Sequence, residues 1–248
     1  MAWDRKEADR IAEQMESQGA EQILRWGVES FFPKIALSSS FGAEDVVIID
    51  LLSRIKPQVT VFTLDTGRLP EETYEVMDRI RERYRIEIVS VFPKREAVEK
   101  LEREKGFYSF RQSVENRQEC CAIRKVEPLN RALAGLEAWI TGLRRGQALT
   151  RTGLAKVEQD AAHGGIVKIN PLADWTAERI WEHIRKNDVP YNKLHDQGFT
   201  SIGCAPCTRA IQPGEDIRAG RWWWELPGHK ECGLHFDSKQ KEEFEKNG

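Results

Sequence analysis

Short apolar segments alternate with helix-like segments along most of this chain, and the alternation restricts the fold more than any other feature. Strands separated by helices favour a parallel sheet that helices cover. The sequence therefore predicts an α/β fold with a parallel, twisted sheet flanked by helices. The predicted strands are 35–37, 59–64, 86–91, 139–142 and 166–169, and the predicted helices are 43–55, 70–84, 97–105 and, after the cap Thr176, 177–187.

Length and charge restrict the class of protein. A chain of 248 residues is long enough to bury a sizeable core. The start lacks the apolar region of a signal peptide, and no apolar run approaches the roughly 20 residues that cross a bilayer. The formal net charge is only -2, which gives no case for bulk nucleic-acid binding. We therefore expect a soluble, cytoplasmic protein with neither a membrane nor a nucleic acid as partner.

Five cysteines predict metal or redox chemistry, because cytoplasmic thiols stay reduced. They are Cys120, Cys121, Cys204, Cys207 and Cys232. Adjacent cysteines are poor joint ligands for one tetrahedral ion, since on a helix they point roughly 100° apart. In a cubane iron-sulfur cluster each binds its own iron, and the Cys-x-x-Cys pair supplies the other two thiolates. We expect a 4Fe-4S cluster, with a four-cysteine zinc site as the alternative.

Two polar loops follow neighbouring strands, where ligands of open parallel sheets bind. The first loop opens a helix, so free backbone amides and the helix dipole are expected to favour an anion there. The second is suited to a ribose or an adenine edge. Simple helix capping is the alternative for the first loop, which also lacks the Lys-Ser/Thr ending of a Walker loop. The loops are Ser38, Ser39, Ser40, Phe41 and Gly42, and Asp65, Thr66 and Gly67.

Two groups of arginines are candidates for anion binding, because a guanidinium recognises phosphate or sulfate oxygens in bidentate fashion. One group follows Gly142, and the other follows the Cys-x-x-Cys pair and precedes three tryptophans. A solvated charged loop is the alternative for the first group. The groups are Arg144, Arg145 and Arg151, and Arg209, Arg218 and Arg221.

Cys232 is the candidate nucleophile. It lies in a polar segment with His229, Lys230 and His235 nearby in sequence, and a neighbouring cation lowers a thiol pKa only if folding brings it close. Taken alone, a spare cysteine is more often inert. Its position after four candidate ligands and two arginine groups favours the catalytic interpretation.

These motifs resemble the assimilatory adenylyl-sulfate reductases, relatives of the phosphoadenylyl-sulfate reductases, over nearly the whole chain. The two cysteine pairs match the iron-sulfur branch, because phosphoadenylyl-sulfate reductases generally keep only the tail cysteine. The resemblance is carried by residues 38–45, 64–67, 120–129, 141–145, 201–209 and 231–235.

The resemblance implies the adenine-nucleotide alpha-hydrolase-like fold of ATP pyrophosphatases, in which the serine loop is a modified pyrophosphate loop. It implies that the cysteine pairs bind the cluster and that Lys125 lies near both cluster and substrate. Arg144, Arg218 and Arg221 would hold the phosphosulfate, and Trp222 would pack close to these arginines. It also implies a homo-oligomer.

The implied reaction is reduction of adenylyl sulfate (APS) to sulfite and AMP through an S-sulfocysteine at Cys232, on a flexible catalytic tail. Reduced thioredoxin, or a glutaredoxin-like donor, would release the sulfite. The nearest alternative is a phosphoadenylyl-sulfate reductase or an enzyme that accepts both nucleotides. More remote alternatives are an ATP pyrophosphatase of tRNA thiolation and a non-catalytic iron-sulfur or zinc redox sensor.

Three parts are predicted along the chain. Residues 1–30 form an N-terminal helical arm, with apolar residues at a loose helical period. Residues 31–208 form the nucleotide-binding α/β domain with the iron-sulfur cluster. Residues 209–248 form an arginine-rich C-terminal segment and the catalytic tail.

Overall fold

The sheet has six strands, and the loops after its central strands form the site described below. The computed structural model describes residues 5–148 and 151–225. The strand order is β3-β2-β1-β4-β6-β5, with every neighbouring pair parallel except β5 and β6. The strands are β1 (Ile35–Ser38), β2 (Thr60–Leu64), β3 (Ile88–Val91), β4 (Ala138–Ile140), β5 (Val157–Asp160) and β6 (Ile166–Ile169).

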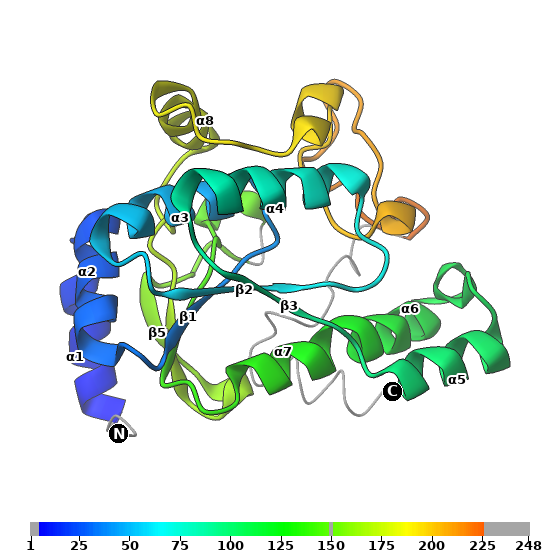
Figure 1. Ribbon diagram of the computed structural model, residues 1–248, viewed down its shortest axis with the longest axis horizontal. Helices are drawn as coiled ribbons and strands as arrows, with labels where there is room; N and C mark the ends of the chain where they lie inside the picture. Colours follow the sequence, from blue (N-terminus) through cyan, green and yellow to red (C-terminus); the bar gives the residue numbers. More distant parts are fainter. Residues whose placement is uncertain (1–4, 149–150, 226–248) are drawn as a thin grey trace.

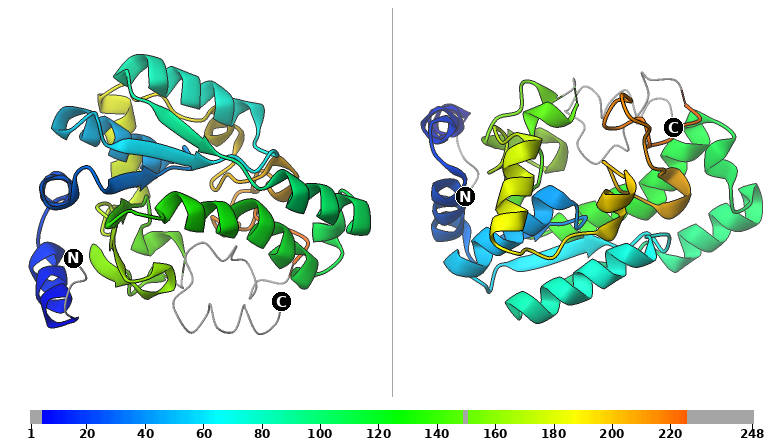
Figure 2. Two further views of the ribbon diagram at one scale, coloured as in Figure 1. Left: turned by 60° about the horizontal axis from the view of Figure 1, so that its bottom comes forward. Right: turned by 90° about the horizontal axis from the view of Figure 1, so that it is seen from above.

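Helices cover both faces of the sheet, as predicted for an α/β fold. Figures 1 and 2 show α3 and α4 on one side of the sheet and α7 on the other, followed outward by α5 and α6. The helices are α1 (Arg5–Glu16), α2 (Ala20–Phe31), α3 (Ala43–Ile55), α4 (Glu71–Tyr84), α5 (Arg95–Lys105), α6 (Val114–Cys121), α7 (Glu127–Leu133) and α8 (Ala177–Lys186).

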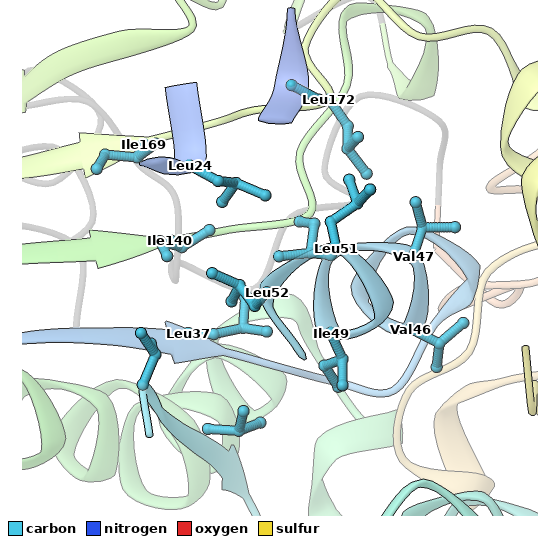
Figure 3. Packing of buried hydrophobic residues seen from close by; sticks show 14 of the residues in the cluster. Leu24, Leu37, Val46, Val47, Ile49, Leu51, Leu52, Ile140, Ile169 and Leu172 are labelled. Carbon is cyan, nitrogen blue, oxygen red and sulfur yellow. The ribbon is translucent and has the colours of Figure 1, made fainter. Parts of the chain in front are cut away.

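The core forms where α3 packs on the sheet. Figure 3 shows Leu52 of α3 close to the strand residues Leu37 and Ile140, and these side chains are at most 3% exposed. Burying one such side chain contributes roughly 1.5–3 kcal/mol. On the opposite face Trp139 is fully buried in a second cluster with residues of α7. The sheet is therefore buried on both sides, which accounts for its nearly continuous apolar strands.

Every predicted strand and helix is confirmed, with each end within two residues of the prediction. The predicted cap Thr176 accepts a hydrogen bond from the Arg179 amide (3.2 Å). The helical N-terminal stretch consists of two helices, because the chain breaks at Gly19, the N-cap of α2. Strand β5 and the helices between 114 and 133 were not predicted. Strand β5 lies at the edge of the sheet, and its mostly polar residues show no apolar strand pattern. Between 114 and 133, charged residues interrupt the helical period of the apolar ones.

In the described part of the chain, no helix is long and apolar enough to cross a membrane.

Candidate active site

A cavity of about 240 Å³ opens at the carboxyl ends of β1, β2 and β4. Strand order reverses between β1 and β4, and such a switch point is where open α/β sheets bind ligands. Most residues predicted for substrate binding meet here. Those on the lining are Ser38, Ser39, Ser40, Gly42, Thr66, Lys125, Gly142, Arg144, Arg218 and Arg221.

The backbone amides of the serine loop are used inside the protein, so the expectation of free amides is wrong for three consecutive residues. The Ser39 amide donates to the Phe62 carbonyl (2.8 Å). The Ser40 amide donates to Asp45 Oδ2 (2.6 Å), and the Phe41 amide donates to Ser39 Oγ (3.1 Å). Phe41 is fully buried with a φ of 57°. The loop is thus held in place by one hydrogen bond within it and by bonds to β2 and α3.

Asp45, in the first turn of α3, organises this loop. Its carboxylate also accepts from Ser40 Oγ (2.9 Å), and it is 6% exposed. Burial raises its pKa to about 6, although the hydrogen bonds from Ser40 and Gly42 act in the opposite direction. A Cβ at Gly142 would lie 2.2 Å from Asp45 Oδ1. Only glycine therefore fits where the loop after β4 approaches this carboxylate.

The Asp65-Thr66-Gly67 loop lies between the large cavity and the thiol of Cys204. Asp65 is 4% exposed and accepts from the Tyr74 hydroxyl (3.0 Å) and the Gly67 amide (2.9 Å). Its role is therefore to hold the loop. The Thr66 hydroxyl lines the cavity and lies 3.2 Å from Cys204 Sγ.

The arginines divide into cavity residues and residues that turn away. Arg144 lines the cavity and forms an ion pair with Glu44 (2.8 Å). Arg145 instead pairs with Glu16 on α1 (2.6 Å). The prediction that the first group converges is thus wrong for Arg145.

The second group divides in the same way. Arg218 and Arg221 line the cavity, and the Arg221 guanidinium stacks 4.7 Å from the Trp222 ring. Arg209 pairs with Glu215 (2.8 Å) instead. The predicted packing of Trp222 beside the cavity arginines agrees with the structure.

The four cysteines in the described part of the chain line a second, smaller cavity. Cys120, Cys121, Cys204 and Cys207 form no disulfide, and each is at most 9% exposed. Four cations line the same cavity: Arg68, Arg117, Arg124 and Lys125.

The thiols differ in acidity. Burial raises the pKa of Cys207 to about 12, and it also raises that of Cys120. Cys204 is fully buried too, but Lys125, the Thr66 hydroxyl and Arg221 outweigh the burial and hold its pKa below the ordinary value. Cys204 is therefore the thiol whose surroundings most favour a thiolate.

No group of three or more His, Cys, Asp or Glu residues in 5–148 and 151–225 is arranged to hold a single metal ion. A cubane cluster needs a wider arrangement, because each of its thiolates binds a separate iron. Four buried thiols around one cation-lined cavity fit that donor set.

A π-helical turn joins the cysteine pair to Lys125. Cys120 and Cys121 end α6, and the π-helix η2 (Ala122–Val126) follows directly. Such turns often occur at functional sites. Lys125 lines both cavities, as do Cys204 and Trp222. The two cavities therefore share a wall.

Several residues of this region lay outside the predicted site. Glu44, Asp45, Gln147 and His195 line the large cavity. Arg117 lines the thiol cavity. Their signals in the sequence were too general, because single charged or polar residues beside a motif occur throughout most chains. The predicted nucleophile, Cys232, lies outside the described residues.

Replacing Asp45 with asparagine is expected to stabilise the protein above pH 6. The folded pKa is about 6 and the ordinary value is 3.8, so the folded state binds the extra proton between these values. Stability therefore falls as pH rises through this window, and at pH 8 the charge costs about 3 kcal/mol. Urea unfolding of both proteins should show Asp45→Asn more stable at pH 8 and the difference gone below pH 4. Equal pH profiles would contradict the assignment.

Comparison with known proteins identifies the family of this chain. The phosphoadenosine phosphosulfate reductase domain matches residues 34–210. The adenosine 5'-phosphosulfate reductase of Burkholderia cepacia is 52% identical, covering 82% of this chain and 80% of that protein. The enzyme of the same name from Pseudomonas aeruginosa (strain LESB58) is 45% identical, covering 91% of this chain and 85% of the other.

A solved structure of a related enzyme has a similar fold. The crystal structure of phosphoadenylyl-sulfate reductase from Candida auris, a phosphate complex, has a TM-score of 0.73 at 28% identity and covers 85% of this chain and 99% of that one. The predicted fold class and the predicted family are therefore both confirmed. The chain belongs to the phosphoadenosine phosphosulfate reductase family.

Proposed function

We propose that this protein reduces adenylyl sulfate to sulfite and AMP in sulfate assimilation. The relatives at 45–52% identity are named adenosine 5'-phosphosulfate reductases. The observation that carries the proposal is the wall shared by the two cavities. Lys125, Cys204 and Trp222 line both the large cavity and the thiol cavity. A site built for nucleotide binding alone has no need of the second cavity.

The proposed chemistry begins with the thiolate of Cys232. It attacks the sulfur of the sulfate group, the bond from that sulfur to the bridging oxygen breaks, and AMP leaves with the electron pair. A thiolate of reduced thioredoxin, or of a glutaredoxin-like donor, then attacks the Cys232 sulfur and releases sulfite. The second donor thiol resolves the mixed disulfide, so both electrons come from the donor.

The cavity cations assist the first step by offsetting charge on the departing phosphate. Lys125, Arg218 and Arg221 line the cavity together with Arg144. Donors fixed in a buried site contribute more than the same groups in water, because little reorganisation accompanies the reaction. Lys125 is only 9% exposed and Arg221 7%, which supports this role.

We also propose a 4Fe-4S cluster on Cys120, Cys121, Cys204 and Cys207. Support comes from the convergence of four buried cysteines, none in a disulfide, on one cavity. Arg117, Arg124 and the other lining cations would offset the negative charge of the thiolates. When bound, the cluster supplies a charged neighbour for Lys125, and the electrons of the reaction come from the thiol donor.

Replacing Cys204 with serine is expected to remove most iron and acid-labile sulfide from anaerobically purified protein, because one of four thiolates is lost. The matched control is Cys232→Ser, which should keep both at the wild-type level. Iron and sulfide are measured on the purified proteins. Zinc without sulfide in the wild type would instead identify a zinc site and overturn the cluster proposal.

The decisive experiment is an intact mass of thioredoxin-free protein mixed with adenylyl sulfate or, separately, with its 3'-phosphorylated analogue. One added sulfonate group at Cys232 with adenylyl sulfate alone would confirm both mechanism and substrate. An adduct with both nucleotides would mean dual specificity, and an adduct with the phosphorylated form alone would make the protein a phosphoadenylyl-sulfate reductase. No adduct in protein that holds its cluster would favour a sensor or a thiolation enzyme.

We propose that the protein works in the cytoplasm and forms a homo-oligomer. A native mass of one chain at micromolar concentration would contradict the second of these.

A further inference from the structure

The serine loop already holds an anion, and that anion belongs to the protein. Asp45 Oδ2 accepts from both the amide and the hydroxyl of Ser40 (2.6 and 2.9 Å). The Gly42 amide also favours the ionised form and lowers the pKa of this carboxyl group. These donors stand at the start of α3, the place where a helix dipole and free amides favour a phosphate.

The carboxylate is fixed as well as paired. The loop after β4 covers Oδ1 so closely that a Cβ at Gly142 would lie 2.2 Å from it. Asp45 is 6% exposed and still forms part of the cavity lining. A ligand that enters the cavity therefore meets a negative charge that has no room to move aside.

Holding the loop does not explain this charge. The side-chain oxygen of an asparagine also accepts hydrogen bonds from an amide and a hydroxyl, without burying an ionised group. Burial works against the ionised form here, as the raised pKa of Asp45 indicates. A neutral side chain would thus serve the fold better, which suggests that the charge serves binding.

The effect on a ligand follows from charge and position. The cationic residues Lys125, Arg218 and Arg221 line the same cavity and suit one phosphosulfate group. A further phosphate placed on the serine loop would find its donors engaged and a carboxylate at contact distance, where like charges repel strongly.

We propose that Asp45 determines specificity: it occupies the anion position of the serine loop and excludes adenine nucleotides that bring an additional phosphate to it. The additional phosphate has two sources, a 5'-diphosphate chain or a 3'-phosphate. The inference rests on the proposed function only in taking an adenine nucleotide as ligand, and it needs neither Cys232 nor turnover.

The test is nucleotide binding by calorimetry to cluster-containing wild type and Asp45→Asn at constant ionic strength. The probes are AMP, ADP and adenosine 3',5'-bisphosphate. We expect Asp45→Asn to improve the affinity for ADP, for the bisphosphate, or for both, relative to AMP, by at least about tenfold, the size expected for removing one fixed charge at contact. The nucleotide that gains identifies which phosphate the loop would receive.

Glu44→Gln is the matched control, because it removes the same charge from the neighbouring residue, whose carboxylate forms an ion pair with Arg144. A relative gain that is equal in both variants would reveal a general field effect and overturn the inference. An unchanged relative affinity in folded Asp45→Asn would do so too, and Asp45→Ser replaces that variant if it fails to fold. Failure of the wild type to bind AMP would count against the proposed function instead.

Discussion

Replacing Cys232 with serine should abolish sulfite formation from adenylyl sulfate and leave the rest of the site intact. A serine hydroxyl is a far weaker nucleophile than a thiolate, and its sulfate ester would not undergo thiol exchange. Loss of the nucleophile costs at least about 10⁴ in rate. Sulfite release with excess thioredoxin measures the rate, and intact mass measures the adduct.

The same variant should bind AMP as tightly as the wild type and contain the same amount of iron and sulfide. These controls separate loss of the nucleophile from loss of the fold. Persistent sulfite formation in Cys232→Ser would remove Cys232 from the mechanism. Lost activity together with lost AMP binding would point to a structural role for this residue.

The second large effect is expected at the ion pair between Arg117 and Glu225. The two side chains are 1% and 4% exposed and meet in a bidentate contact of 2.7 and 3.0 Å. The Arg117 guanidinium also lies 4.6 Å from the Trp222 ring. Replacing Glu225 with glutamine removes the carboxylate that offsets this buried charge, which costs about 3–5 kcal/mol.

For a chain of this length, that loss corresponds to a melting temperature lower by roughly 10 °C. Differential scanning calorimetry of anaerobic protein checks the shift. The control is Glu75→Gln, which breaks an exposed ion pair with Lys193 (3.0 Å) and should leave the melting temperature within about 2 °C. Equal shifts in both variants would mean that burial of the Arg117 pair carries no special weight.

The fold was readable from the sequence where local pattern and burial agree. Helix α3 has the bounds predicted from the sequence, because nearly every apolar residue between 43 and 55 is buried. The stretch 114–133 gave no such signal. There Arg117 and Arg124 are buried by ion pairs with distant residues, Glu225 and Glu102, which no local pattern reports.

The site was predictable in its residue types and not in its contacts. The serine loop, Lys125, Arg144 and the two cysteine pairs all lie on cavities, as their motifs indicated. Which arginines reach the cavity depends on partners: Glu16 on α1 holds Arg145 away. The engagement of the serine-loop amides by Asp45 depends on backbone geometry, which residue identity does not determine.

The π-helical turn between the cysteine pair and Lys125 has a consequence for evolution. It spans Ala122–Val126, and each residue of a regular helix adds about 100° of rotation and 1.5 Å of rise. Losing or gaining one residue here would rotate Cys120 and Cys121 relative to the whole of α7 and its attachment to the sheet. Substitutions can accumulate along this stretch, whereas a change in its length would move the thiols relative to Lys125 in a single event. Chains descended from this one should therefore preserve the spacing of Cys121 and Lys125 more strictly than the identity of the residues between them.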